Sequence, residues 1–406
     1  MATVETLTVT PISDTMAHLD AAGSLEQLPN SSTASEKVSF EPSKHLAYTP
    51  PSKVHTMEEL GYPGSRGVSP IGVSEPFPLF STEAIQQMRK EVLSDKSSPN
   101  INTQVNLLSA SSGDTQKSAF SLCSSFGIEL TVWNRYAPFV YDAWKNPETL
   151  AIISKIAGVD LVPAMDLEIG HINISMHTEE EKNKALKAVM EKANREADEG
   201  VSGCPWEDDH PIVDWHTDSY PFVCVTMLSD CKGMIGGETA LRKGNGEVVK
   251  VRGPQMSIQG SAVILQGRYI EHQALRALGT TERISMVTSF RPRASLIKDD
   301  TVLTTVRPIS DLGELYLQFA EYRFDMLQDR FRDANKLMRD QQRARRPFDT
   351  LRLKQFIREQ IEFLEHMERE IVEDEKVIKG VIDDSHLISE DLKLQRSKKR
   401  RVVVVA

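Results

Sequence analysis

Hydrophobic and polar residues alternate with a period of two through the middle of the chain, in residues 161–176 and again in residues 222–290. Successive side chains of a strand point to opposite faces, so this alternation predicts β-strands. The strand-like runs are separated by turn residues, and Asn245-Gly246 predicts a tight hairpin between two of them. Short strands joined by short turns indicate a closed or sandwiched β architecture.

Apolar residues recur at helical spacing on both sides of this region. Ser81 is the expected N-cap of a first helix. Further helices are predicted over residues 138–144, 147–157, 178–198, 311–345 and 350–379. The charged helix over residues 178–198 is expected to pack on the β structure, with a lid as the alternative. Pro347 separates the last two helices, which are expected to form a hairpin. That hairpin either packs on the β structure, forms a homodimer or contributes a wall to a substrate pocket.

Changes in composition predict four segments. Residues 1–55 are rich in Ser, Thr, Pro and Glu, and they are expected to form a disordered tail. Residues 56–300 form the main β domain, residues 301–380 the helical hairpin, and residues 381–406 a flexible basic tail. The basic run Arg396–Arg401 is expected to be part of that solvated tail, with a nuclear address as the alternative.

Charge and cysteine content narrow the range of partners. The 406 residues have a formal net charge of −10, which argues against a nucleic-acid partner because phosphate neutralisation needs a basic surface. The 4 cysteines show no C-x-x-C spacing, which favours reduced thiols and a cytoplasmic location. No apolar run reaches the ~20 residues that a membrane helix needs, so no membrane partner is expected. A small molecule is the expected partner.

His216 and Asp218 form a His-x-Asp motif, and a second histidine, His272, follows on a later strand-like stretch. Residues i and i+2 of a strand share a face, so His216 and Asp218 can bind one ion together. Two imidazoles and one carboxylate suit non-haem Fe(II) and leave positions open for a co-substrate and O2. These three residues are therefore the predicted metal ligands and catalytic residues.

Arg283 and Ser285 form an Arg-x-Ser motif at a fixed distance after His272. A guanidinium fork and a hydroxyl on one strand face match a carboxylate through charge-assisted hydrogen bonds. The two residues are therefore predicted to bind a carboxylate, and the motif alone does not specify which molecule provides it.

With these motifs the chain resembles the Fe(II)- and 2-oxoglutarate-dependent oxygenases, which are built on a double-stranded β-helix, or jelly roll. The similar branch contains isopenicillin N synthase and the plant hormone oxidases, in which Arg-x-Ser follows His-x-Asp…His at this spacing. Gly236-Gly237 also fits, because a Gly-Gly turn between the ligand strands is common in that fold. The resemblance covers roughly residues 125–293. The expected fold class is mainly β with α: a jelly-roll core, flanking helices and a C-terminal helical hairpin.

The resemblance implies that His216, Asp218 and His272 bind Fe(II), and that Arg283 and Ser285 bind the distal carboxylate of 2-oxoglutarate. In isopenicillin N synthase the same Arg-x-Ser binds the substrate's own carboxylate, so that assignment stays open as an alternative.

The resemblance also makes Asn173, on the strand-like stretch before the metal motif, a candidate contact for the co-substrate, and His171 a weaker one. A solvated polar strand face is the alternative for both. Five residues flank the predicted ligands and are candidates for lining a pocket: Trp215, Tyr220, Gln266, Arg268 and Tyr269.

The implied reaction couples decarboxylation of 2-oxoglutarate by O2, giving succinate and CO2, to oxidation of an unactivated C–H bond. Hydroxylation, desaturation and ring closure are all compatible with the motifs. An amino acid or a natural-product intermediate is the expected substrate, in the manner of fungal secondary-metabolism oxygenases. A protein-modifying oxygenase and a non-catalytic jelly-roll binding protein are the alternatives from other classes. The second is disfavoured because a scaffold has no need for polar residues converging inside a barrel.

Overall fold

Two antiparallel sheets form the centre of the structure, a computed structural model that describes residues 38–93, 137–198, 211–254, 258–394 and 396. The order along the eight-stranded sheet is β1 (Val54–Thr56), β2 (Ile71–Ser74), β11 (Ser261–Leu265), β7 (Phe222–Met227), β14 (Glu282–Pro292) and β4 (Leu161–Pro163), with β3 (Phe77–Pro78) beside β11 and β5 (His171–Met176) beside β14. The four-stranded sheet has the order β10 (Val248–Val251), β9 (Thr239–Arg242), β12 (His272–Leu275) and β6 (Pro211–His216). A separate short pair consists of β8 (Ile235–Gly236) and β13 (Ala277–Leu278).

The alternation predicted from the sequence divides each strand of the large sheet between two environments. On β14, Ile284 and Met286 belong to a hydrophobic core that the sheet shares with the helices. Arg283 and Ser285, on the opposite face, line a cavity between the two sheets. Each central strand therefore contributes one face to the stability of the fold and the other to the site.

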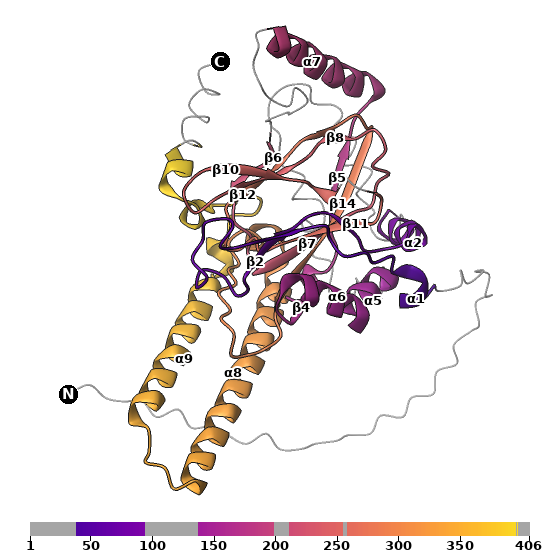
Figure 1. Cartoon of the computed structure of the whole chain (residues 1–406). Coiled ribbons are helices and arrows are strands. Elements are labelled where there is room, and N and C mark those ends of the chain that lie inside the picture. Colours follow the sequence, from indigo (N-terminus) through magenta and orange to yellow (C-terminus); the bar gives the residue numbers. More distant parts are fainter. Residues whose placement is uncertain (1–37, 94–136, 199–210, 255–257, 395, 397–406) are drawn as a thin grey trace, which may run out of the picture. The chain divides into compact units, whose positions relative to one another are not determined.

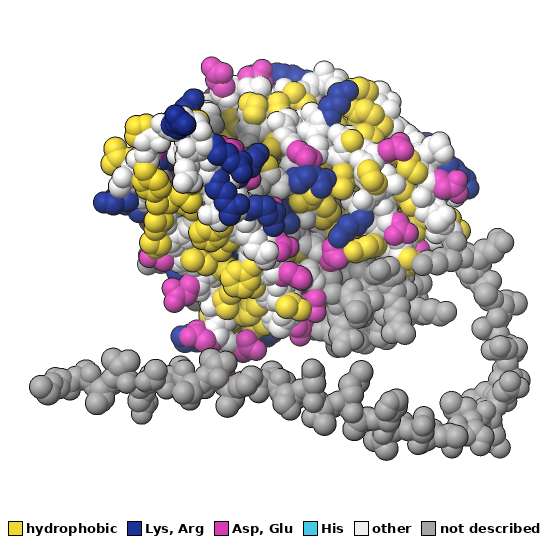
Figure 2. Space-filling model, turned by 90° about the horizontal axis from the view of Figure 1, so that it is seen from below, with side chains coloured by type: hydrophobic (Ala, Val, Ile, Leu, Met, Phe, Trp, Pro, Cys, Tyr) yellow, Lys and Arg dark blue, Asp and Glu magenta, His cyan; other side chains and the backbone are white. Residues whose placement is uncertain are grey.

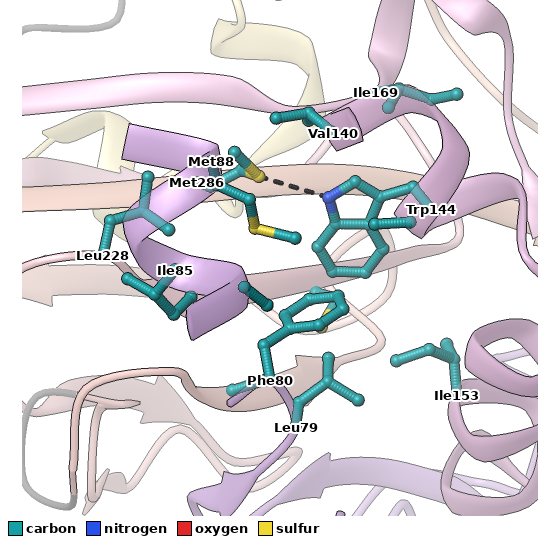
Figure 3. Packing of buried hydrophobic residues seen from close by; sticks show 14 of the residues in the cluster. Leu79, Phe80, Ile85, Met88, Val140, Trp144, Ile153, Ile169, Leu228 and Met286 are labelled. Atoms are coloured by element: carbon teal, nitrogen blue, oxygen red, sulfur yellow. Dashed lines mark hydrogen bonds between the residues drawn. The ribbon is translucent and has the colours of Figure 1, made fainter. Parts of the chain in front are cut away.

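Helices α2 (Thr82–Val92), α5 (Pro138–Lys145) and α6 (Pro147–Ala157) supply the rest of that core (Figure 1). The predicted N-cap of α2 is confirmed, because the Ser81 hydroxyl accepts a hydrogen bond from the Ala84 backbone N–H. Trp144 is fully buried at the centre of the cluster (Figure 3). Its ring packs edge-on against Phe80, and its Nε1 lies 3.2 Å from Sδ of Met286 on the sheet.

The predicted hairpin at Asn245-Gly246 is confirmed as the connection between β9 and β10, with Gly246 at a φ of 87°. The helix predicted over residues 178–198 is also present, as α7 (Glu179–Asp198). None of its described side chains lines either of the two cavities that meet at the site.

Helices α8 (Leu312–Arg343) and α9 (Thr350–Glu370) lie side by side (Figure 1). Arg330 donates to Gln360 across the pair, and the rings of Phe331 and Phe356 are 5.6 Å apart. The prediction that the second helix continues to residue 379 is wrong, since α9 ends at Glu370. Glu373, Asp374 and Glu375 follow, and acidic residues are unfavourable at the negative end of a helix.

Large hydrophobic side chains remain exposed on α8 and α9, and hydrophobic side chains lie between charged ones on the face seen in Figure 2. The most exposed on these two helices are Leu317, Phe324, Phe331, Leu351, Ile357 and Ile361. Among the described residues, no helix combines the length and the apolar character needed to cross a membrane.

The expected N-terminal tail over residues 1–55 is wrong for its second part. Residues from Val38 onward belong to the same compact unit as the sheets. His45, in the short helix α1 (Pro42–His45), is buried against Phe139, and Leu46 forms a bridge with Phe80. These contacts join residues far apart in the chain, so local composition did not indicate them. Residues 1–37 lie outside the described residues.

We expect replacement of Trp144 by Ala to lower the free energy of unfolding by about 3–5 kcal/mol, because it leaves a large cavity in the core beneath the sheet. Urea denaturation followed by circular dichroism measures the change. Phe324→Ala, on an exposed position of α8, is the control and should change the value by no more than about 0.5 kcal/mol. An equal loss in both variants would contradict the central role of Trp144.

Candidate metal centre

The antiparallel pairing of β6 with β12 places the two predicted histidine ligands directly opposite each other, His216 against His272. Their ring centroids are 4.2 Å apart. Asp218 follows β6 by two residues, and its Oδ1 lies 3.5 Å from Nε2 of His216 and 3.6 Å from Nε2 of His272. The three ligand atoms all lie within 4.8 Å of one another. The structure therefore brings together the three residues that the sequence motif singled out.

Backbone contacts orient both imidazoles toward the centre of this group. Nδ1 of His216 lies 2.8 Å from the carbonyl oxygen of Asp214, and Nδ1 of His272 lies 2.9 Å from that of Ile270. A carbonyl can only accept, so each Nδ1 is protonated and each Nε2 presents its lone pair. Fixing the tautomer through the distal nitrogen is what metal-binding histidines require.

Charges in the group suit a cation. Burial and the adjacent His216 imidazole lower the pKa of His272 to about 4, so His272 is neutral near pH 7. Burial would raise the pKa of Asp218, but the two imidazoles outweigh it and the pKa is lowered. One oxygen of Asp218, Oδ2, is buried without a hydrogen-bond partner among the described residues. A buried carboxylate oxygen without a donor is costly, and a bound divalent cation would satisfy it.

A glycine that the motif did not include makes room for Asp218. The Asp218 backbone N–H donates to the carbonyl oxygen of Gly267, 3.0 Å away. A Cβ on Gly267 would lie only 1.7 Å from Oδ2 of Asp218. The segments around Asp218 and Gly267 are separated in the chain by β7 to β11 and lie in close contact. This contact requires glycine at position 267. The only sequence signal was an isolated glycine beside a strand, which is compatible with many roles.

The other predicted residues lie across the cavity, on the large sheet. Arg283 and Ser285 share the inner face of β14, and Asn173 on β5 pairs in register with Ser285. All three line a cavity of about 130 Å³ together with the three candidate ligands. The remaining walls are mainly aliphatic: Val73, Val213, Val223, Val225, Val263, Leu265 and Val287.

The surroundings of Arg283 favour binding of an anion. Its Nε is buried without a hydrogen-bond partner, and no carboxylate of the described residues forms an ion pair with its guanidinium. Burial lowers its pKa, yet an arginine remains charged at neutral pH. An unpaired buried cation is unfavourable by several kcal/mol, about the amount that a bound carboxylate would recover. The cavity thus offers a metal-binding group on one side and a carboxylate-binding group on the other.

Of the five residues flanking the predicted ligands, Tyr220 alone lines a cavity that borders the candidate metal centre. The Gln266 side chain binds backbone groups of residues 68–71, and Arg268 and Tyr269 both bind Asp300. Trp215 faces away from the metal centre, against Ile388 and Leu392.

The C-terminal segment packs behind the ligand strands, so the prediction of a flexible tail over residues 381–406 is wrong for its described part. Arg396 donates to the Trp215 carbonyl and to Asp384. Ser389 donates to Glu271, the neighbour of His272, at 3.0 Å. Thr217, between His216 and Asp218, donates to the Leu387 carbonyl at 3.3 Å. The basic composition of this segment indicated solvent exposure, but tertiary partners determined its position.

No protein-family model and no curated protein matches the chain. Among solved structures, it is similar to an oxidoreductase of the 2OG-Fe(II) oxygenase family from Burkholderia pseudomallei, with 12% identity over 38% of this chain and 55% of that one and a TM-score of 0.25. It is also similar to the non-haem α-ketoglutarate-dependent epimerase SnoN from nogalamycin biosynthesis, with 11% identity over 59% of this chain and 81% of that one and a TM-score of 0.26. A third is a dioxygenase for auxin oxidation in rice, with 16% identity over 42% of this chain and 72% of that one and a TM-score of 0.17. The chain thus spans only about half of the Burkholderia structure. These similarities are partial, so what the site can do has to be judged from its own residues.

Replacing Gly267 by Ala is expected to weaken Fe(II) binding at least about tenfold while the fold is kept, because the new methyl group displaces the Asp218 carboxylate. Anaerobic titration calorimetry with Fe(II) measures the affinity. Gly64→Ala is the matched control, since a Cβ there meets nothing within 4 Å. Equal Fe(II) affinities for the two variants would contradict the role of Gly267.

Replacing Arg396 by Ala should lower Fe(II) affinity about tenfold by releasing the strand that holds His216, an effect typical of residues that support metal ligands. Lys376→Ala, which removes an exposed ion pair with Glu373, is the control and should leave the affinity unchanged. If Arg396→Ala binds Fe(II) as tightly as the unmodified protein, the C-terminal segment does not position the ligands.

Proposed function

We propose that the protein is a non-haem Fe(II)- and 2-oxoglutarate-dependent oxygenase with a jelly-roll core. The observation that supports this most directly is the cavity between the sheets. It has two histidines and an aspartate on the small-sheet side. On the large-sheet side it has an arginine whose Nε is buried without a hydrogen-bond partner among the described residues. This arrangement fits a co-substrate that chelates a metal at one end and has a carboxylate at the other.

In this proposal, Nε2 of His216, Nε2 of His272 and an oxygen of Asp218 hold Fe(II). Arg283 and Ser285 bind the distal carboxylate of 2-oxoglutarate, which leaves its keto-acid end directed toward the metal. When bound, Fe(II) with 2-oxoglutarate and O2 supplies an oxidant that removes hydrogen from an unactivated C–H bond, with succinate and CO2 as co-products.

The protein's own contribution is orientation and exclusion of water. The carbonyls of Asp214 and Ile270 fix the imidazole tautomers, so the ligands need no rearrangement when the metal binds. The aliphatic walls keep water from the reacting atoms, and they strengthen the ion pair with Arg283 by lowering the local dielectric constant.

We further propose a small-molecule substrate, an amino acid or a natural-product intermediate, and a role in secondary metabolism. The two cavities that meet at the candidate metal centre have volumes of about 130 and 80 Å³, which suit small molecules. A polypeptide substrate would need a long open groove beside the metal. A larger hollow, of about 1040 Å³, is lined mainly by residues of α5, β4 and α8 and contains none of the candidate ligands.

Anaerobic addition of Fe(II) and then 2-oxoglutarate is expected to give a weak visible charge-transfer band that needs both components. Arg283→Gln should bind 2-oxoglutarate at least about 30-fold more weakly, because it removes one partner of a buried charge pair. Titration of the band measures the affinity. Arg293→Gln is the control, since Arg293 is exposed and pairs with Asp160 at the surface.

Two results would change the proposal. If Fe(II) binds but 2-oxoglutarate produces no band, Arg283 holds the substrate's own carboxylate, as in isopenicillin N synthase. If Fe(II) itself does not bind, the oxygenase proposal is wrong.

A further inference from the structure

A second cavity, of about 80 Å³, meets the candidate metal centre from another side. It shares His216, Asp218 and Asn173 with the first cavity. Its other walls come from β5, β7 and β14, from the turn before β5, from the segment after Asp218 and from the residues just before α8. These residues are Glu168, His171, Ile172, Ser219, Tyr220, Val223, Val287, Ser289, Thr305, Val306 and Ile309. At roughly 10–15 Å³ per water, the volume holds about six waters, the scale of a small organic molecule.

The wall of this cavity contains a buried acid. Glu168 is 2% exposed. Its Oε2 lies 3.1 Å from Nε2 of His171 and accepts a hydrogen bond from the Ser289 hydroxyl at 3.2 Å. Its other oxygen, Oε1, has no hydrogen-bond partner among the described residues, and the buried hydroxyl of Tyr220 has none either. Glutamates are almost never fully buried unless they are paired, so an incompletely bonded one beside a cavity indicates a ligand.

His171 contacts Oε2 of Glu168 and does not occupy Oε1. The Glu168 carboxylate raises the pKa of His171, although burial opposes the shift. The hydrogen bond between His171 and Oε2 holds the Glu168 carboxylate in one orientation. No hydrogen bond of good geometry reaches Oε1, although the Tyr220 hydroxyl lies near the Glu168 carboxylate. A carboxylate oxygen can accept more than one hydrogen bond, and a protonated amine is the donor that pairs with it most strongly.

Apart from Asp218, which they share, the two cavities differ in their charged groups. The first contains the unpaired cation Arg283, and the second contains the acid Glu168. A dicarboxylate is attracted to the first and repelled by the second, and an ammonium group behaves in the opposite way. The cavities can therefore select different molecules although both border His216 and Asp218.

We infer that the second cavity binds the organic substrate and that this substrate is a small amine or amino acid whose ammonium group donates to Oε1 of Glu168. This assignment rests on the proposed function, because the first cavity is then filled by 2-oxoglutarate. His216 and Asp218 border the same cavity, so a substrate bound there lies beside the candidate metal ligands. The structure thus assigns a substrate-recognition role to Glu168, a residue outside the metal and Arg-x-Ser motifs.

Binding is tested with glycine, L-alanine and L-valine, each compared with the hydroxy acid that replaces its amine: glycolate, L-lactate and 2-hydroxyisovalerate. Titration calorimetry is run on the anaerobic Fe(II)–2-oxoglutarate complex and on the metal-free protein. At least one amine should bind, and its hydroxy acid should bind at least about 30-fold more weakly. Failure of all three amines, or equal binding of amine and hydroxy acid, overturns the inference.

Glu168→Gln keeps the shape of the side chain and removes its charge. It should weaken amine binding at least about 30-fold and leave the 2-oxoglutarate charge-transfer band unchanged. Tyr220→Phe, a second variant that removes only a hydroxyl, should weaken amine binding by a smaller factor. Glu148→Gln, at an exposed position of α6, is the control.

Unchanged amine affinity in Glu168→Gln would overturn the inference. The proposed function is tested by a different result: it is wrong if the unmodified protein gives no charge-transfer band with Fe(II) and 2-oxoglutarate. In that case, amine binding by the metal-free protein that depends on Glu168 would still support the second cavity as an amine site.

Discussion

The site depends on one antiparallel strand pairing, that of β6 with β12. It sets His216 opposite His272, and because the two residues are in register their side chains emerge on the same face of the small sheet. A slip of one residue would turn one imidazole to the other face and abolish the group. The surrounding structure holds this register in place. Backbone carbonyls orient both rings, and the segment through Arg396 packs behind the two strands.

Around that pairing the protein keeps several polar atoms incompletely bonded. Oδ2 of Asp218, Nε of Arg283 and Oε1 of Glu168 are buried without hydrogen-bond partners among the described residues. Each is unfavourable for the stability of the fold by itself. The largest core cluster lies on the outer face of the large sheet around Trp144. Another cluster includes Val73, Val223 and Val263, which also line the first cavity. Side chains alternate between the two faces of each strand. The outer faces can therefore pack into a rigid framework while the inner faces remain available for ligands.

Local backbone geometry made several features of the site and fold predictable from the sequence alone. His216 and Asp218, and likewise Arg283 and Ser285, are two residues apart, so any extended backbone places each pair on one face. The hairpin at Asn245-Gly246 and the N-cap at Ser81 follow from the dihedral angles and hydrogen bonds that these residues favour, and both are present. What the sequence by itself determined was therefore the type of each element and the face that its polar residues share.

Only the tertiary structure decided which of those faces meet. That His272 lies opposite His216, and that Gly267 must lack a Cβ for Asp218 to fit, depends on strand register and on contacts between distant segments. Residues 38–55 and the described part of the C-terminal segment have polar, tail-like composition, yet they are fixed by partners far away in the chain. Glu168 carried no recognisable signal either. Periodicity is a property of neighbouring residues, whereas proximity in space results from packing of the whole chain, and packing placed these residues.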